Sequence, residues 1–230
     1  KTSVPEDAFY DCDALTTVTI GNSTTDIGES AFEECDNLSS VKLGNNIKHI
    51  YDYAFEDSGL KSITFPSSVT YIGSEAFSNT ALTSVTIPST ITEFGADGWN
   101  NYKWSGSNFR NCSNLTSVTF NASCDIPTFA FADCSNLKTV TIGNSTTGID
   151  NYAFKDCTAL QSVKIGGSVE YIGDERGRVK QMRLQKMELG EADASGRRRP
   201  VPIEGAIETI DVDEVIVSVG VSPNPLIPRA

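Results

Sequence analysis

Apolar residues recur along this chain in blocks that repeat almost always every 22 or 23 residues. The most regular unit is an alanine followed by a phenylalanine, at 8–9, 31–32, 54–55, 76–77, 130–131 and 153–154, with Asn108-Phe109 in the same place once. A spacing of the form Leu-x-x-Val-x-Ile follows these pairs, as in Leu137, Val140 and Ile142. Because side chains alternate between the two faces of a strand, these apolar residues share one face of a short strand.

A second apolar position lies seven residues after that strand, as at Ile149, and predicts a second extended piece in each turn. The Ala-Phe pair then belongs on the opposite wall, where Ala allows close approach and Phe fills the interior. By alternation Thr17 and Thr19 face outward. One turn cannot bury this apolar set alone, whereas stacked turns can. The sequence therefore predicts a β-rich leucine-rich-repeat solenoid of seven turns over residues 1–173.

The turn from Val85 to Gly95 reads Val-Thr-Ile-Pro-Ser-Thr-Ile-Thr-Glu-Phe-Gly, and Ser-Glu-Ala-Phe precedes it at 74–77. Together with Cys-x-x-Leu in sister turns, this resembles the BspA-like leucine-rich repeats of bacterial and protist surface proteins. The resemblance covers residues 1–173. It implies an extracellular or cell-surface protein that adheres to host matrix or to other cells, and it brings no catalytic residues, so we expect no enzyme.

The net charge of the chain limits the kinds of molecule that it can bind. Residues 1–173 hold nine Lys and Arg against twenty Asp and Glu, a net charge of −11, and residues 174–230 hold nine against ten, a net of −1. An acidic solenoid repels phosphate backbones, so we expect no nucleic-acid partner. No run of 18 apolar residues occurs, so we expect no membrane span. The start at Lys1 without a methionine suggests a trimmed or excerpted chain.

Five of the six cysteines occupy one slot, three residues after the phenylalanine: Cys12, Cys35, Cys112, Cys134 and Cys157. Ser58 and Thr80 fill it in two other turns, so the slot takes a small, weakly polar side chain, and we interpret the cysteines as a structural ladder. Disulfides between adjacent turns and a zinc site are the alternatives, but the ladder gives each thiol the same orientation and no Cys-x-x-Cys occurs. Cys124 is off the ladder and is the thiol to test for reactivity. We expect no metal and no cofactor.

The only histidine, His49, precedes Ile50 in the second extended piece of its turn. By alternation it should point away from the core. It has no nucleophile or carboxylate at catalytic spacing in the sequence, which argues against a role as a general base.

One break in the period stands out. From Phe77 to Phe109 the spacing is 32 residues, so about ten residues are inserted after Phe94, and they include Trp99, Tyr102, Lys103 and Trp104. Insertions in solenoids map to surface loops, and exposed Trp and Tyr rings stack on sugars or anchor protein partners. The alternative is that these rings fold back and plug a gap in the coil. We take this insertion as the candidate binding site for a protein or carbohydrate ligand.

The repeat fails after Ile172, where Gly173-Asp174-Glu175-Arg176-Gly177 replaces the expected Ala-Phe. We therefore expect two parts, the solenoid at 1–173 and a non-repeat tail at 174–230. In the tail, residues 178–189 read as an extended segment, 190–200 as a turn-rich loop and 212–219 as an apolar strand.

Three stretches of the tail, at 186–191, 195–205 and 213–225, resemble the small subunit of NADPH-dependent glutamate synthase, a flavin and pyridine-nucleotide oxidoreductase. The resemblance implies a partial β-meander of the nucleotide domain. The Gly-x-Gly-x-x-Gly turns and the cluster cysteines are absent, so no activity is carried over. Two functions compete: a surface interaction solenoid with a foreign or degenerate tail, and a chimeric or accessory chain of such an oxidoreductase, inactive as it stands.

Overall fold

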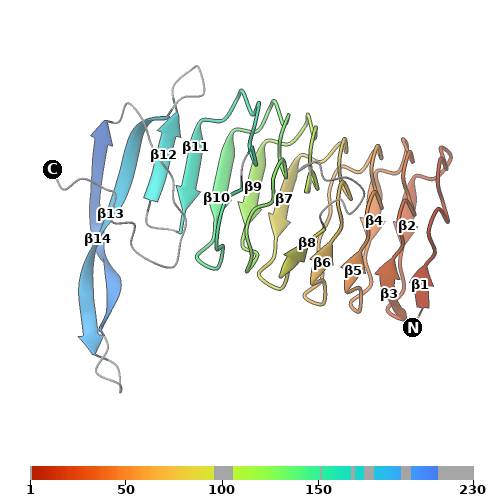
Figure 1. The fold of residues 1–230 in the computed structure, drawn as a ribbon, viewed down its shortest axis with the longest axis horizontal. Coiled ribbons are helices and arrows are strands. Elements are labelled where there is room, and N and C mark those ends of the chain that lie inside the picture. The colour runs from red at the N-terminus through yellow and green to blue at the C-terminus, as the bar shows by residue number, and fades with distance from the viewer. Residues whose placement is uncertain are drawn as a thin grey trace.

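The computed structural model describes residues 2–95, 106–150 and 152–166, and the backbone of 169–173, 179–192 and 198–211. These residues form a solenoid whose turns follow one another in chain order, with strands and turns and no helix (Figure 1). The predicted leucine-rich-repeat solenoid of about seven turns is confirmed.

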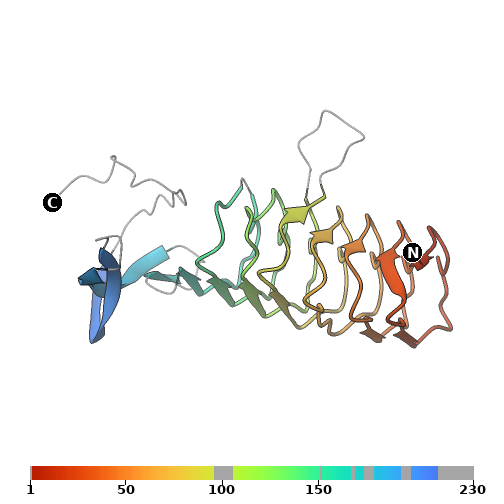
Figure 2. The same cartoon turned by 90° about the horizontal axis from the view of Figure 1, so that it is seen from below.

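One wall of the solenoid is a five-stranded parallel sheet with one short strand from each of five turns. Its order is β1 (Thr2–Val4), β3 (Thr24–Ile27), β5 (His49–Ile50), β6 (Tyr71–Ile72) and β8 (Glu93–Phe94). In Figure 2 these strands lie on the side of the coil away from the other strands. The second extended piece expected in each turn is therefore present here, and its inward residues Ile27, Ile50 and Ile72 are fully buried.

The strands that carry the Leu-x-x-Val-x-Ile spacing form a second wall. β2 (Thr17–Thr19) and β4 (Ser40–Lys42) form a two-stranded parallel sheet. Further along the same wall, β7 (Ser84–Ile87), β9 (Ser117–Phe120), β10 (Thr139–Ile142) and β11 (Ser162–Ile165) pair in parallel as part of a seven-stranded sheet. The equivalent valines stand in register, as Val118 with Val140. They point inward while Thr17 and Thr19 are exposed, as predicted.

A column of seven stacked phenylalanine rings runs along the solenoid, fully buried in its middle turns and with Phe9 42% exposed at its first end. Consecutive rings have centroids 5.1 to 5.5 Å apart and are within 13° of parallel: Phe9, Phe32, Phe55, Phe77, Phe109, Phe131 and Phe154. An alanine precedes six of the seven rings, and Asn108 precedes Phe109. Ala31 and Ala54 are fully buried.

The backbone segments that carry the Ala-Phe pairs form a further wall of the solenoid, which we call the Ala-Phe wall. Between its turns, backbone N–H groups donate from each turn to the next one along the chain. The Phe9 N–H donates to the Ala31 carbonyl (2.9 Å), and the same bond recurs from turn to turn, as from Phe131 to Ala153 (2.8 Å). The residues two before and two after each phenylalanine have positive φ, for example Asp133 at 61°. Many of them also donate to the next turn, as Asp133 does to the Lys155 carbonyl (2.8 Å). The left-handed backbone thus helps to align N–H groups along the solenoid axis.

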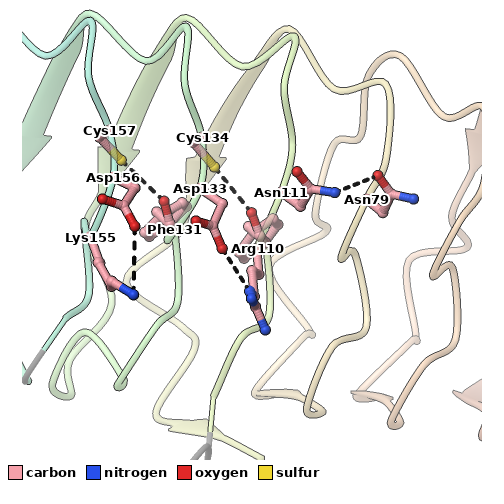
Figure 3. Close-up of polar contacts among 10 residues, drawn as sticks. Asn79, Arg110, Asn111, Phe131, Asp133, Cys134, Lys155, Asp156 and Cys157 are labelled. Carbon is pink, nitrogen blue, oxygen red and sulfur yellow. Dashed lines mark hydrogen bonds and ion pairs between the residues drawn. The ribbon is translucent and has the colours of Figure 1, made fainter.

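The cysteine ladder has a specific role in this wall. The Cys157 thiol donates to the carbonyl of Phe131 in the preceding turn (3.2 Å), and Cys134 does the same to Phe109 (Figure 3). Where the slot holds Ser58 or Thr80, the hydroxyl donates to a phenylalanine carbonyl of its own turn. A small donor is needed because a buried carbonyl without a partner is costly. The structural interpretation of the ladder is confirmed, and all six thiols are free.

The solenoid ends differently from its repeat. β12 (Val169–Gly173) holds the residues that form a parallel strand of the five-stranded wall in earlier turns, but it turns back and pairs antiparallel with β11, Ile172 opposite Ser162. β13 (Val179–Ala192) and β14 (Arg198–Asp211) follow as a long antiparallel hairpin (Figure 1). The extended segment predicted at 178–189 is present. The loop predicted at 190–200 is wrong in extent, because cross-strand pairing continues to Ala192 and Arg198. The strand predicted at 212–219 lies outside the described residues.

Substitution of one ring tests the column. Phe131 is fully buried and stacked on both sides, so we expect Phe131→Ala to lower the free energy of unfolding by about 3 to 5 kcal/mol, through lost burial and the cavity left behind. Chemical denaturation monitored by circular dichroism measures this. A cost below about 1 kcal/mol would contradict the stacking described here.

Candidate interaction surfaces

The predicted binding residues Trp99, Tyr102, Lys103 and Trp104 lie outside the described residues. The structure does fix both ends of their segment. Gly95 donates its N–H to the Ile72 carbonyl (2.7 Å), and the Gly106 carbonyl accepts from the Glu75 N–H (3.2 Å). Both ends are therefore held by turns of the regular coil.

The longer turn leaves the phenylalanine column unchanged. Phe77 and Phe109 are 32 residues apart, yet their rings stack at 5.2 Å, as do pairs that are 22 or 23 residues apart. The ten added residues therefore do not separate the two turns that flank them.

Asn108 marks the return from the insertion to the coil. It stands where the other turns have the alanine of the Ala-Phe pair, and its Nδ2 donates to the Gly73 carbonyl (2.6 Å). Its side chain is fully buried, and its Oδ1 accepts no hydrogen bond. An amide in this position ties the end of the insertion to the turn before it. The sign of this contact in the sequence was that Asn108 replaces the alanine of the Ala-Phe pair.

Three aromatic rings cluster on the outer face of the five-stranded wall. The His49 and Tyr51 ring centroids are 5.9 Å apart, Tyr51 and Tyr71 are 5.8 Å apart, and His49 and Tyr71 are 6.3 Å apart. Tyr51 is 41% exposed, and His49 is partly exposed, as predicted for an outward position. We call these three residues the aromatic triangle. It was not predicted from the sequence.

The register of the wall assembles this cluster. Asp26, His49, Tyr71 and Glu93 are partners across β3, β5, β6 and β8, so their side chains form one outward row. The His49 Nδ1 and Asp26 Oδ1 atoms are 2.5 Å apart. Tyr51 sits two residues further along, and the next turn has Gly73 at that place. A Cβ on Gly73 would come within 2.4 Å of the Asp52 backbone nitrogen, so only glycine fits there.

Carboxylates surround the triangle. The Asp52 carboxylate accepts from the Ser74 N–H (2.8 Å) and from the Tyr71 hydroxyl. Burial, followed by the charges of Asp52 and Glu93, raises the pKa of Tyr71 to about 12. The Tyr71 hydroxyl therefore remains a neutral donor at physiological pH.

A hollow of about 300 Å³ lies at the next position along this face, lined in part by Glu93, Cys124, Asp125 and Asp150. Burial, and then the charges of Asp125 and Glu93, raises the pKa of the Cys124 thiol to about 11. A thiol with so high a pKa holds very little thiolate at neutral pH, so Cys124 is a poor nucleophile.

The outer side of the Ala-Phe wall carries polar side chains in rows one turn apart. Figure 3 shows Arg110 paired with Asp133 (Nε to Oδ2, 2.9 Å), Lys155 beside Asp156 (3.5 Å) and Asn111 donating to Asn79 (2.9 Å).

The earlier turns of this wall are strongly acidic. Glu56 lines a hollow of about 380 Å³ with Glu75. Burial raises the pKa of Glu56 to about 8, and the charges of Glu75 and Asp57 add to the effect.

Among the described residues the partners of the His49 ring are Asp26, Tyr51 and Tyr71, none of them a serine or a cysteine. Across the described ranges, no group of three or more His, Cys, Asp or Glu is arranged to hold a metal ion. In the same ranges no helix is long and apolar enough to cross a bilayer.

Comparison with known protein families gives a match over most of the chain. The model of the BspA type leucine-rich repeat region matches residues 1–105 and 103–176, with six copies of the repeat.

Solved structures resemble the same region. A leucine-rich repeat protein from Bacteroides ovatus superposes with a TM-score of 0.59 at 26% identity, covering 72% of this chain and 41% of that one. The leucine-rich repeat protein of T. pallidum superposes with a TM-score of 0.58 at 27% identity, covering 69% of this chain and 71% of that one.

The C-terminal region gives short matches to oxidoreductases. It is 43% identical over 51 residues to the beta subunit of the NADPH-Fe(3+) oxidoreductase of Geobacter sulfurreducens, which is 22% of this chain and 8% of that subunit. It is 46% identical over 46 residues to the beta subunit of the NADP(+)-dependent formate dehydrogenase of Moorella thermoacetica, 20% and 6% of the two chains. The chain spans less than a tenth of these curated relatives.

The raised pKa of Glu56 gives a pH prediction. Between its ordinary value of 4.5 and the folded value of about 8, the folded state binds more protons than the unfolded chain, so Glu56 makes stability fall as pH rises through this range. We expect Glu56→Gln to raise the melting temperature at pH 8 to 9 and to leave it nearly unchanged near pH 4. Asp13→Asn, at an exposed position, is the control. An equal gain in melting temperature from Asp13→Asn would show that the effect comes from general charge repulsion and not from the raised pKa of Glu56.

Proposed function

Because this chain belongs to the BspA-type leucine-rich repeat family, we propose that it is a non-enzymatic interaction protein of the cell surface or of the secreted space. It binds a protein or a glycan through the solenoid surface and so supports adhesion. The family membership and the likeness to bacterial leucine-rich repeat structures support this role.

The insertion at 96–105 is the proposed contact site. The observation that supports this proposal is the stacking of Phe77 on Phe109. Because the ten added residues leave the phenylalanine column intact, the fold does not depend on them and they can be used to bind a partner. They include two tryptophans and a tyrosine next to Lys103. Large amphipathic rings of this kind dominate binding energy at interfaces.

The test replaces Trp99, Tyr102 and Trp104 together with alanine. Binding to immobilised matrix glycoproteins should be lost, while the melting temperature changes by no more than a few degrees. Enzymatically deglycosylated forms of the same glycoproteins separate a glycan ligand from a protein one. Tyr152→Ala is the matched control, because this ring is 62% exposed on a different wall.

If instead the three rings fill a gap in the coil, the triple variant should lose several kcal/mol of stability. Unchanged binding together with a large fall in melting temperature would contradict the proposed contact site.

The tail is the basis of the second candidate function, an accessory chain of an NADPH-dependent oxidoreductase. The short matches favour it, but they cover less than a tenth of each oxidoreductase. The sequence has no Gly-x-Gly-x-x-Gly turn to place backbone N–H groups around a dinucleotide phosphate. We therefore propose that residues 1–173 are the functional unit and that residues 174–230 add no oxidoreductase activity.

Truncation tests this division. We expect residues 1–173 alone to unfold cooperatively and to retain partner binding, because each full turn supplies its own buried set. We expect the full chain to show no NADPH binding by calorimetry. Loss of cooperative unfolding on truncation would show that the hairpin of β13 and β14 is an essential cap. Micromolar NADPH binding would favour the second candidate.

A further inference from the structure

A second surface, made of residues other than those of the insertion, has its own chemical character. It consists of the aromatic triangle and the outward row that runs through it, from Asp26 through His49 and Tyr71 to Glu93. The row is negative at both ends and aromatic in the middle. The face of a tyrosine ring attracts cations, and carboxylates beside it add to that attraction.

We propose that this surface docks an arginine-bearing segment of a partner protein. The guanidinium group is planar, so it stacks on the Tyr51 ring while its N–H groups reach a carboxylate. Tyr51 offers the ring, since it is 41% exposed and the equivalent position in the next turn is Gly73, which has no side chain. Lysine, a compact and strongly hydrated charge, gains less from such a site.

Geometry limits where the carboxylate contact can form. Asp26 is occupied, with His49 on one oxygen and the Thr25 hydroxyl on the other. Asp52 accepts from Ser74 and Tyr71. Glu93 is exposed, lies in register with Tyr71 and lines the neighbouring hollow with Asp125. Of these three carboxylates Glu93 is the exposed one beside Tyr71, so the proposal assigns it as the acceptor for the docked arginine and assigns the hollow to a second basic residue.

The overall charge of the chain supports the same partner class. With a formal net charge of −12, the protein attracts basic segments at long range, and the triangle gives one place on it a preference for arginine. This inference rests on the proposed interaction role but not on the insertion.

The probe is a fluorescein-labelled peptide of alternating arginine and serine, with its lysine counterpart, titrated by fluorescence anisotropy at about 150 mM salt. We expect the arginine peptide to bind at least threefold more tightly than the lysine peptide. Tyr51→Leu should weaken arginine-peptide binding about three- to fivefold, and Tyr51→Phe, which keeps the ring, should leave it unchanged. Lys48→Gln, which removes an exposed positive charge next to His49, should tighten it.

Charge-matched variants separate the site from general attraction. Glu93→Gln should weaken binding severalfold, whereas Glu34→Gln, which removes one exposed carboxylate from the Ala-Phe wall, should not. Tyr152→Leu should also have no effect. Equal losses from Glu93→Gln and Glu34→Gln would overturn the proposal, as would equal affinity for the two peptides or full binding by Tyr51→Leu.

The triple alanine variant of the insertion separates this inference from the proposed contact site. It should bind the arginine peptide normally while losing the matrix glycoproteins. Loss of peptide binding in that variant would show that the arginine peptide binds at the insertion. It would overturn the docking proposal but would not contradict the proposed function. Binding of neutral glycans at the triangle in place of the arginine peptide would likewise overturn it.

Discussion

The phenylalanine column sets the spacing on which every other feature depends. Stacked rings 5.1 to 5.5 Å apart hold adjacent turns at a distance close to that between hydrogen-bonded strands, so that the ladders on both strand walls can form at the same time. A turn that lengthens must do so without disturbing this spacing. The 32-residue turn meets that condition, since its rings stack like the others.

Hydrogen bonding explains which residues flank the column. Phenylalanine carbonyls in the interior need a donor, and in many turns the cysteine of the following turn supplies it, as Cys134 does for Phe109 and Cys157 does for Phe131. Cysteine, serine and threonine are interchangeable there because each is small and carries a hydrogen. Five of the six cysteines thus occupy a position that hydrogen bonding to the backbone defines.

The repeated part of the fold could be predicted because each structural position recurs in several turns of the sequence. The alternation around Val140 predicted the inward face of the strand, and the recurring Ala-Phe pair predicted that the phenylalanines fill the interior, although the stacking of their rings was not predicted. The direction of β12 could not be predicted, because Val169 to Ile172 fit the parallel pattern, and their antiparallel pairing depends on the hairpin that follows.

The aromatic triangle was missed for a related reason. The positions of His49 and Tyr51 hold other residues in the other turns, and the tyrosine at the Tyr71 position recurs only at Tyr171, so the three residues form no motif. The available signal was the alignment of Asp26, His49, Tyr71 and Glu93 at the repeat period, which places them in one row. The insertion was visible in the sequence, yet its ligand is decided by side-chain arrangement, which spacing alone does not give.

The one-directional hydrogen bonds of the Ala-Phe wall have an electrical consequence. Peptide groups whose N–H bonds all point from earlier to later turns have dipoles that add, as they do along a helix, so this wall is polar from end to end, with its positive end at the later turns. Two such solenoids match at their ends only head to tail. Duplication of a repeat preserves this polarity, so an array of these turns can lengthen in evolution without any reversal of its field.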